Sequence, residues 1–277
     1  MPAGSSINNK LAFTNDGERN PIMSDNSEPT VQVPPAVSVV VPVRNEADNI
    51  APLVNEIAMA LAGRWSFEVI YVNDGSRDAT EAVLKQLMGE RPWLRQIKHA
   101  QSCGQSAAVR SGVAAARAPL IATLDGDGQN DPKFIPALLQ TLVDGSPQIG
   151  LVAGQRVGRR ATAFKKFQSR VGNGVRNAVL RDGTRDTGCG LKAFRRDVFL
   201  ALPYFDGLQR FLPALVRRDG HAIGYLDVVD RPRHAGVSKY GLWDRLWVGI
   251  LDLAGVWWLI RRRKRIPDVT EVTLNAR

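Results

Sequence analysis

Cysteine is scarce in this chain of 277 residues: only Cys103 and Cys189 occur, far apart and in no CxxC pair. This scarcity excludes a disulfide framework and a zinc site built from cysteines, and it is typical of the reducing cytosol. The first 36 residues also lack an apolar stretch of signal-peptide length, because polar and acidic residues interrupt them throughout. We therefore expect residues 1–36 to form a disordered tail and the catalytic part to stay inside the cell.

Acidic residues become few in the second half of the chain. Residues 1–150 carry 12 Lys and Arg against 16 Asp and Glu, whereas residues 151–277 carry 25 against 11, which gives a net charge of +10. A basic half of this kind fits nucleic acid, anionic lipid or a phosphorylated substrate. The sequence shows no RNP-type aromatic strand, zinc finger or helix-turn-helix signature. We therefore expect no nucleic-acid partner, and a phosphorylated partner at the basic half.

Apolar strand patterns and helical periods alternate from Val37 onward. Strands are predicted at 37–42, 67–72, 94–99, 119–124, 149–153 and 222–229. Helices are predicted at 46–62, 78–89, 105–117, 132–144 and 210–218. This alternation indicates an α/β fold with right-handed βαβ units and a mostly parallel sheet. In such sheets, ligands bind beyond the carboxyl ends of the strands.

Asp125, Asp127 and Gln129 directly follow an apolar strand and stand on alternate residues. Alternate residues of an extended segment point the same way, so their oxygens can approach one hard cation. Mg²⁺ or Mn²⁺ bound there would keep positions for substrate phosphates, such as those of a nucleotide diphosphate. An isolated DxD pattern also arises in ordinary turns, and its place at a strand end is what favours the metal site.

Two other acids near strand ends have both functional and structural interpretations. Asp74 could accept a hydrogen bond from a nucleotide base, or it could cap the next helix or form a turn. Glu46 is equally ambiguous, because the helix dipole favours an acid in the first helical turn. The histidines His99, His221 and His234 receive no role.

Five segments, in this order along the chain, carry a family resemblance. They are PVRNEADNI (42–50), VNDGSRDAT (72–80), DGDGQNDP (125–132), DTGCGLKAFRR (186–196) and RPRHAGVSKYG (231–241). Together they resemble family 2 glycosyltransferases, and more narrowly the polyprenyl-phosphate group that includes dolichol-phosphate mannose synthases. The resemblance implies a GT-A (Rossmann-like) domain over 37–241, an inverting transfer and a divalent metal, Mg²⁺ or Mn²⁺.

The resemblance also implies roles for the donor side of the site. Asp125, Asp127 and Gln129 match the metal-binding DxDxQ element of the family. Four residues match positions that contact the nucleoside: Pro42, Glu46, Val72 and Asp74. Gly126 stands beside the diphosphate, where the family usually has alanine, and Arg210 matches a basic residue that binds the donor pyrophosphate.

For the acceptor side, Arg156 matches an arginine that lies between the donor and acceptor phosphates. Lys165 and Ser169 resemble an Arg-xxx-Ser pair that holds the acceptor phosphate, with lysine in place of the bidentate arginine. Arg233 and Lys239 match an RxxGxSK loop that closes over the phosphates of both substrates. The catalytic candidates are Asp127, Arg156 and Asp186. Asp186 could position the sugar or a basic residue, or it could instead cap a turn.

The segment 242–265 has helical spacing with two unlike faces. Asp244, Arg245 and Asp252 share one face, apolar residues with four tryptophans share the other, and a basic cluster, 261–265, follows. This pattern predicts an amphipathic helix in a membrane interface, followed by a tail at 266–277. A core-facing helix is the alternative; Asp252 argues against a full span, which would bury its charge at a cost of about 2.5–3.5 kcal/mol. One such segment leaves homo-oligomerisation open as a way to strengthen anchoring.

We therefore expect transfer of a sugar from a UDP- or GDP-sugar to a polyprenyl phosphate at the cytoplasmic face of the inner (plasma) membrane. One alternative keeps the fold but uses a hydroxyl acceptor in glycan or lipopolysaccharide assembly, which would need a general base beside the metal. The other is a non-catalytic, basic, lipid-binding adaptor. The candidate metal ligands Asp125, Asp127 and Gln129 are all present on alternate residues, which argues against an inactive site.

Overall fold

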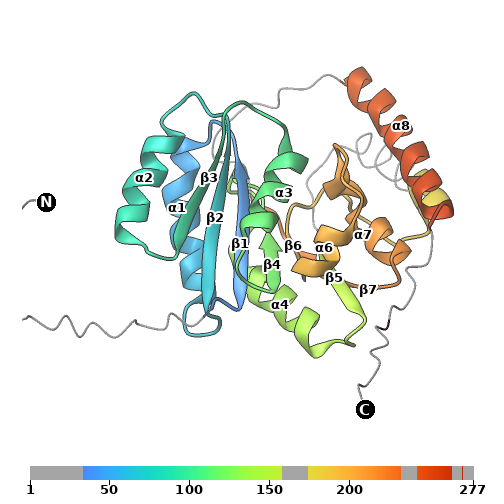
Figure 1. Cartoon of the computed structure of the whole chain (residues 1–277), viewed down its shortest axis with the longest axis horizontal. Helices are drawn as coiled ribbons and strands as arrows, with labels where there is room; N and C mark the ends of the chain where they lie inside the picture. Colours follow the sequence, from blue (N-terminus) through green and yellow to red (C-terminus); the bar gives the residue numbers. More distant parts are fainter. Residues whose placement is uncertain (1–33, 158–173, 232–241, 264–269, 271–277) are drawn as a thin grey trace, which may run out of the picture. The chain divides into compact units, whose positions relative to one another are not determined.

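The computed structural model describes residues 34–157, 174–231, 242–263 and 270 (Figure 1). Its strands are β1 (Val37–Val43), β2 (Phe67–Asp74), β3 (Leu94–His99), β4 (Leu120–Thr123), β5 (Ile149–Arg156), β6 (Lys192–Arg195) and β7 (Ala222–Val228). Its helices are α1 (Ala47–Leu61), α2 (Thr80–Glu90), α3 (Gln105–Ala115), α4 (Ile135–Asp144), α6 (Arg196–Ala201), α7 (Leu208–Arg218) and α8 (Leu242–Arg261). A 3-10 turn at Pro132–Phe134 precedes α4, and a short helical segment covers 174–180.

The strands form one seven-stranded sheet in the order β3-β2-β1-β4-β6-β5-β7. Neighbouring strands are parallel except at β6, which runs antiparallel to both β4 and β5. The predicted mostly parallel α/β fold is thus confirmed. β6 sits between β4 and β5 because the loop after the 174–180 segment brings it back against the direction of the other strands.

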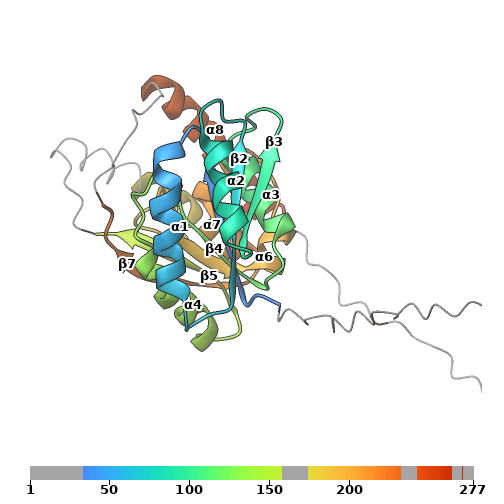
Figure 2. The same ribbon diagram turned by 90° about the vertical axis from the view of Figure 1, so that its left-hand side faces the viewer.

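Two hydrophobic layers cover the sheet, one on each face (Figures 1 and 2). Successive residues of β1 alternate between them: Val39 and Val41 pack in the layer with α1, α2 and α4, and Val40 packs in the layer with α3, α6 and α7. This is the period of two that a strand buried on both faces requires. The continuous apolar run of β1 in the sequence therefore has a direct structural cause.

The C-terminal helix α8 lies against α7 (Figure 1). Val256 is buried there, and the Arg218 guanidinium of α7 donates from Nε to the Leu259 carbonyl at 3.0 Å. Among the described residues, no helix combines the length and the apolar character that crossing a membrane requires. The predicted boundaries at 36/37 and 241/242 stay predictions, and residues 1–33, 266–269 and 271–277 of the predicted tails lie outside the described residues.

We predict that Gly112→Ala will destabilise the fold. A Cβ at Gly112, on the sheet-facing side of α3, would lie 2.4 Å from Val40 Cγ1 and 3.0 Å from Val72 Cγ2. Overpacking of this kind costs about 1–3 kcal/mol. The matched control is Gly89→Ala in α2, where nothing lies within 4 Å of the added Cβ; it should stabilise by about 0.5–1 kcal/mol. Urea unfolding of both variants checks the prediction, which equal shifts would contradict.

Candidate active site

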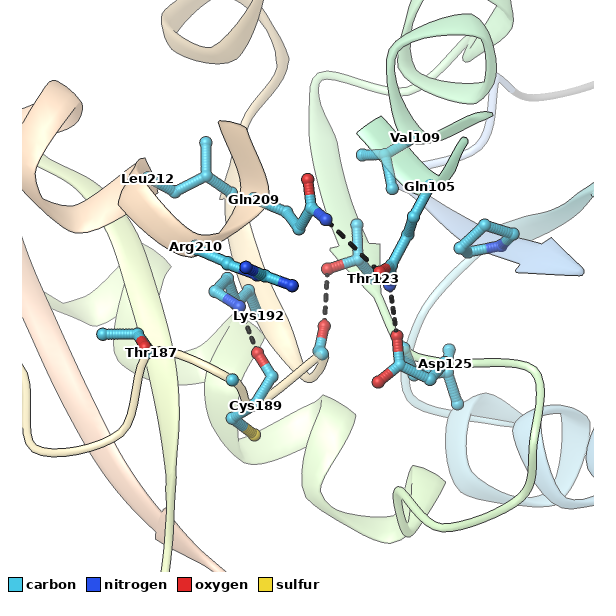
Figure 3. Close-up of a pocket in the computed structure, with 14 residues that line it drawn as sticks. Gln105, Val109, Thr123, Asp125, Thr187, Cys189, Lys192, Gln209, Arg210 and Leu212 are labelled. Atoms are coloured by element: carbon cyan, nitrogen blue, oxygen red, sulfur yellow. Dashed lines mark hydrogen bonds between the residues drawn. The ribbon is translucent and has the colours of Figure 1, made fainter. Parts of the chain in front are cut away.

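The carboxyl ends of β1, β2 and β4 meet at one edge of the sheet, as their parallel registers require. A cavity of about 200 Å³ opens beside that edge, between the β4 end, α3, the 187–190 loop and the start of α7 (Figure 3). Its polar lining comprises Gln105, Thr123, Asp125, Thr187, Lys192, Gln209 and Arg210. Thus segments more than 100 residues apart in the sequence surround one polar cavity.

Asp125 is the acidic group of this cavity. Its Oδ1 accepts a hydrogen bond from Gln105 Nε2 at 2.7 Å, and Gln209 Nε2 donates in turn to Gln105 Oε1 at 3.3 Å (Figure 3). Burial and the neighbouring carboxylate of Asp127 raise the pKa of Asp125 to about 6, against the opposing effect of Lys192 and Arg156. The carboxylate pair is therefore unfavourable by itself, and a cation beside it would relieve the repulsion.

The 125–130 turn holds these carboxylates in place. Asn130 Oδ1 accepts from the Asp125 backbone N–H at 3.0 Å, and Asp127 Oδ1 accepts from that of Gln129 at 3.1 Å. A Cβ at Gly126 would lie 2.3 Å from Val43 Cγ1, so the alanine usual in the family would force Val43 to move. Glycine at 126 thus lets the turn lie close against the end of β1.

The 188–190 loop approaches the turn through another glycine. A Cβ at Gly190 would lie 2.4 Å from Asp125 Oδ2, so only glycine allows this approach. Thr123 Oγ1 donates to the Gly190 carbonyl at 2.9 Å, and the buried Lys192 ammonium donates to the Cys189 carbonyl (Figure 3). Burial lowers the pKa of Lys192, while Asp125 is among the groups that favour its charged form.

Arg156, at the end of β5, lies between two carboxylates. Its Nε and Nη2 donate to the two oxygens of Asp186 at 2.5 and 2.9 Å, and its Nη1 donates to Asp230 Oδ2 at 3.1 Å. Burial raises the pKa of Asp186, but the Arg156 hydrogen bonds and charge outweigh it and hold that pKa below its usual value. Arg156 and Asp186, both predicted as site residues, are thus brought together, and Asp230 joins them although the sequence analysis gave it no role.

Asp74 is bound on all sides by the loop that follows β3. Its two oxygens accept hydrogen bonds from His99 Nδ1 (2.7 Å), Ser102 Oγ (2.7 Å) and the backbone N–H groups of Cys103 (2.8 Å) and Gly104 (3.0 Å). Burial raises its pKa, but these hydrogen bonds prevail and lower it below the usual value. Ligand-type atoms of Asp74, His99 and Cys103 lie within 4.8 Å of one another, which is consistent with the hydrogen bonds that Asp74 accepts from the His99 ring and the Cys103 backbone. Asp74 therefore shapes the loop that leads into α3.

The other predicted nucleoside contacts are placed unequally. Pro42 lines the cavity, whereas Glu46 is the N-cap residue of α1, and its carboxylate accepts a hydrogen bond from Asn49 Nδ2 at 2.7 Å. Val72 is fully buried between the sheet and α3, so its side chain has no surface to offer a nucleoside in this structure. Its burial follows from its position inside a central strand.

Four predicted residues cannot be compared with the structure. Lys165, Ser169, Arg233 and Lys239 lie outside the described residues. Arg210, by contrast, lines the cavity from the first turn of α7. Four further residues of the site were not predicted: Gln105, Lys192, Gln209 and Asp230. Lys192 lies within the 186–196 motif, and Asp230 directly precedes the 231–241 motif.

Residues 38–202 match the family described as Glycosyl transferase family 2. The chain belongs to this family. It is 36% identical over 236 residues to the dodecaprenyl-phosphate galacturonate synthase of Rhizobium johnstonii, covering 83% of this chain and 68% of the relative. It is 31% identical over 209 residues to the undecaprenyl-phosphate 4-deoxy-4-formamido-L-arabinose transferase of Edwardsiella ictaluri, covering 74% of this chain. The glycosyltransferase described here spans 63% of that relative's length.

Solved structures show the same fold at lower identity. The glucosyl-3-phosphoglycerate synthase of Mycobacterium tuberculosis, in complex with Mn²⁺, UDP and glucosyl-3-phosphoglycerate, superimposes with a TM-score of 0.61. The identity is 20%, over 84% of this chain and 81% of the other. The complex of the same synthase with Mg²⁺ and UDP also gives 0.61, at 21% identity and 80% coverage of each chain. The similarity confirms the GT-A fold of the transferase.

We predict that Arg156→Lys will destabilise the transferase by about 2–3 kcal/mol. Lysine keeps the charge but cannot donate to Asp186 and Asp230 at once, so a largely buried carboxylate loses its partner. The matched control is Arg185→Lys, because the Arg185 side chain, which pairs with Asp227, is 66% exposed; a pair this exposed is worth at most about 1 kcal/mol. The free energy of unfolding in urea is measured for both variants. Equal losses would show that the contacts of Arg156 with Asp186 and Asp230 stabilise the fold no more than an exposed ion pair does.

Proposed function

We propose that this transferase moves a sugar, with inversion, from a nucleotide diphosphate-sugar to a polyprenyl phosphate, using Mg²⁺ or Mn²⁺ at the cytoplasmic face of the inner membrane. The observation that carries the proposal is the placement, at one sheet edge, of Asp125 beside Asp127 and within electrostatic reach of Lys192 and Arg156, with Arg210 lining the same cavity. The named relatives, which act on dodecaprenyl and undecaprenyl phosphates, support the acceptor class.

The residues at the β4 end fit a divalent cation. Asp125 and Asp127 would supply hard oxygen ligands, and a cation would offset both the burial of Asp125 and its repulsion by Asp127, which together raise the pKa of Asp125. Gln129 would complete the set. A metal held there would neutralise the charge that develops on the leaving diphosphate. Arg210, at the cavity wall, would add a second positive charge beside that diphosphate.

The clamp around Arg156 suits an acceptor that carries its own charge. Three of the five guanidinium N–H groups donate to Asp186 and Asp230, which fixes the plane of the group and leaves two N–H groups to hold a phosphate. A phosphate oxygen is nucleophilic without a strong base, so the chain's task is to position two anions against each other. Asp186 then acts as a positioning residue for Arg156.

A hydroxyl acceptor is the second candidate, and it would need a general base. Asp186 is a poor base, because Arg156 holds its pKa below the usual value. This favours a phosphate acceptor over a hydroxyl. The third candidate, a non-catalytic adaptor, gives no reason for two carboxylates to stay adjacent in a polar cavity at a cost in free energy.

The proposal is tested by supplying a panel of radiolabelled UDP- and GDP-sugars, including UDP-galacturonate, with undecaprenyl phosphate in detergent and measuring lipid-extractable label. We expect label with one donor, dependent on Mn²⁺ or Mg²⁺, and a loss of at least about 100-fold in Asp127→Asn, because a metal ligand and its charge are removed. The charge-matched control, Asp144→Asn at the exposed end of α4, should keep full activity. Label in a soluble hydroxyl acceptor alone would favour the second candidate, and undiminished transfer by Asp127→Asn would refute the metal assignment.

The exposed face of α8 supports attachment to a membrane surface. Ile250, Leu251, Trp257 and Trp258 are all exposed on this helix, with Leu251 at 70%, although they are apolar. Their spacing places them on one side, opposite Val256 and Leu253, which pack on α7. Arg261, Arg262 and Arg263 follow at once and are exposed. An apolar helical face with tryptophans and adjoining arginines is the composition of helices that lie in an anionic bilayer interface.

We predict that Trp257→Ser/Trp258→Ser will weaken binding to vesicles of phosphatidylcholine and phosphatidylglycerol by about tenfold or more, because two half-exposed indoles no longer enter the interface. Met59→Ser on α1, whose side chain is 72% exposed, is the control for loss of an exposed apolar group and should bind as wild type. Vesicle co-flotation gives the affinities, and metal-dependent hydrolysis of the donor in solution should survive in both variants. Unchanged flotation of the tryptophan variant would refute the proposed attachment.

A further inference from the structure

A groove of about 380 Å³ lies between the C-terminal half of α7, the end of the 174–180 segment and the last turns of α8. It is separate from the cavity beside Asp125. Arg210 lines that cavity, whereas Arg217 lines this groove, about 10 Å further along α7. We call it the arginine groove. It is lined by Val179, Leu180, Arg181, Ala214, Arg217, Arg218, Trp257, Ile260 and Arg261.

Positive charge dominates the rim of the groove. Four arginines line it. Among the described residues, only Arg218 of these four forms an ion pair with a carboxylate, that of Asp219 at 2.8 Å. Arg261 lies over the Trp257 ring, with its guanidinium carbon 3.9 Å from the ring centroid. The groove therefore combines several guanidinium groups with an apolar wall of Leu180 and Ile260, a combination that suits an anion carrying a hydrocarbon tail.

The backbone at Arg181 is a second, independent observation. Arg181 has a φ of 52°, in the left-handed region, where a residue with a Cβ is uncommon and glycine or asparagine is preferred. Its N–H bonds to the Asn177 carbonyl at 2.8 Å, which ends the 174–180 helical segment. An arginine at this position places a long cationic side chain on the groove despite the strain, and strain of this kind is concentrated at ligand sites.

We propose that the arginine groove binds the phosphate headgroup of an anionic phospholipid, with the beginning of an acyl chain along Leu180, Trp257 and Ile260. The groove opens beside the exposed tryptophans of α8, so a lipid seated in it would belong to the same bilayer surface. A free phosphate would leave the apolar wall uncovered, and this favours the lipid. The inference rests on the proposed membrane attachment of α8 and adds a contact with one anionic headgroup to it.

The test uses dihexanoyl-phosphatidylglycerol below its micellar concentration, so that no charged surface is present, and measures binding to the full chain by isothermal titration calorimetry. We expect saturable binding with one site, at least about tenfold weaker binding of dihexanoyl-phosphatidylcholine, and a loss of about tenfold or more in Arg181→Gln/Arg217→Gln. Arg262→Gln/Arg263→Gln is the control, because it removes the same charge from two exposed arginines that do not line the groove. It should bind as wild type.

Three results would overturn the proposal: no binding of the short-chain lipid, equal loss in both double variants, or glycerol 3-phosphate binding as tightly as the lipid. Flotation with the phosphatidylcholine and phosphatidylglycerol vesicles used for the tryptophan variant separates this failure from a failure of membrane attachment. If only the groove is wrong, wild type still floats on these vesicles and Trp257→Ser/Trp258→Ser floats less. If attachment by α8 is wrong, wild type and the tryptophan variant float to the same degree. Circular dichroism verifies that each variant is folded.

Discussion

Repulsion between carboxylates at one sheet edge is the constraint that organises this transferase. Asp125 and Asp127 follow β4, and Asp186 and Asp230 lie within reach of the same cations. Arg156 compensates part of this negative charge, because its guanidinium donates to both Asp186 and Asp230. These contacts join the end of β5 to the 186–190 loop and to the residues that follow β7. The remaining charge, at Asp125, faces the cavity. The protein thus stabilises Asp186 and Asp230 through Arg156, and the proposed cation would offset the charge of Asp125 and Asp127.

The fold was readable from the sequence because its signals are local. The β-branched run of β1 and the helical spacing of α1 each depend on a few consecutive residues, and the polar strand ends follow from parallel pairing. The prediction missed α6, which has six residues and no room for a helical period. It also left β6 out, since nothing local in four residues marks a strand or its antiparallel direction.

The site was only partly readable, because much of it depends on contacts between distant segments. Gln105 and Gln209 meet from α3 and α7, and a lone amide in a helix carries no signal in the sequence. His99 received no role, yet it binds Asp74 at 2.7 Å across two neighbouring strands. For Val72, the resemblance suggested a nucleoside contact, whereas its place inside β2 buries its side chain.

The structure shows which side of α8 packs against α7, which the sequence pattern left open. The pattern gave two unlike faces but not which one meets the protein. Asp252 points toward the start of α7, since a Cβ at Gly207 would lie 3.0 Å from its Oδ2. Burial and the neighbouring Asp206 raise the pKa of Asp252, against the opposing charge of Arg210. Among the described residues of α8, the side that bears Asp252, Leu253 and Val256 faces the protein, and the side that bears Trp257 and Trp258 stays exposed. The helix α7, against which α8 packs, also carries Gln209 and Arg210, which line the cavity beside Asp125. A membrane that binds α8 would therefore also fix how this cavity is oriented relative to the bilayer.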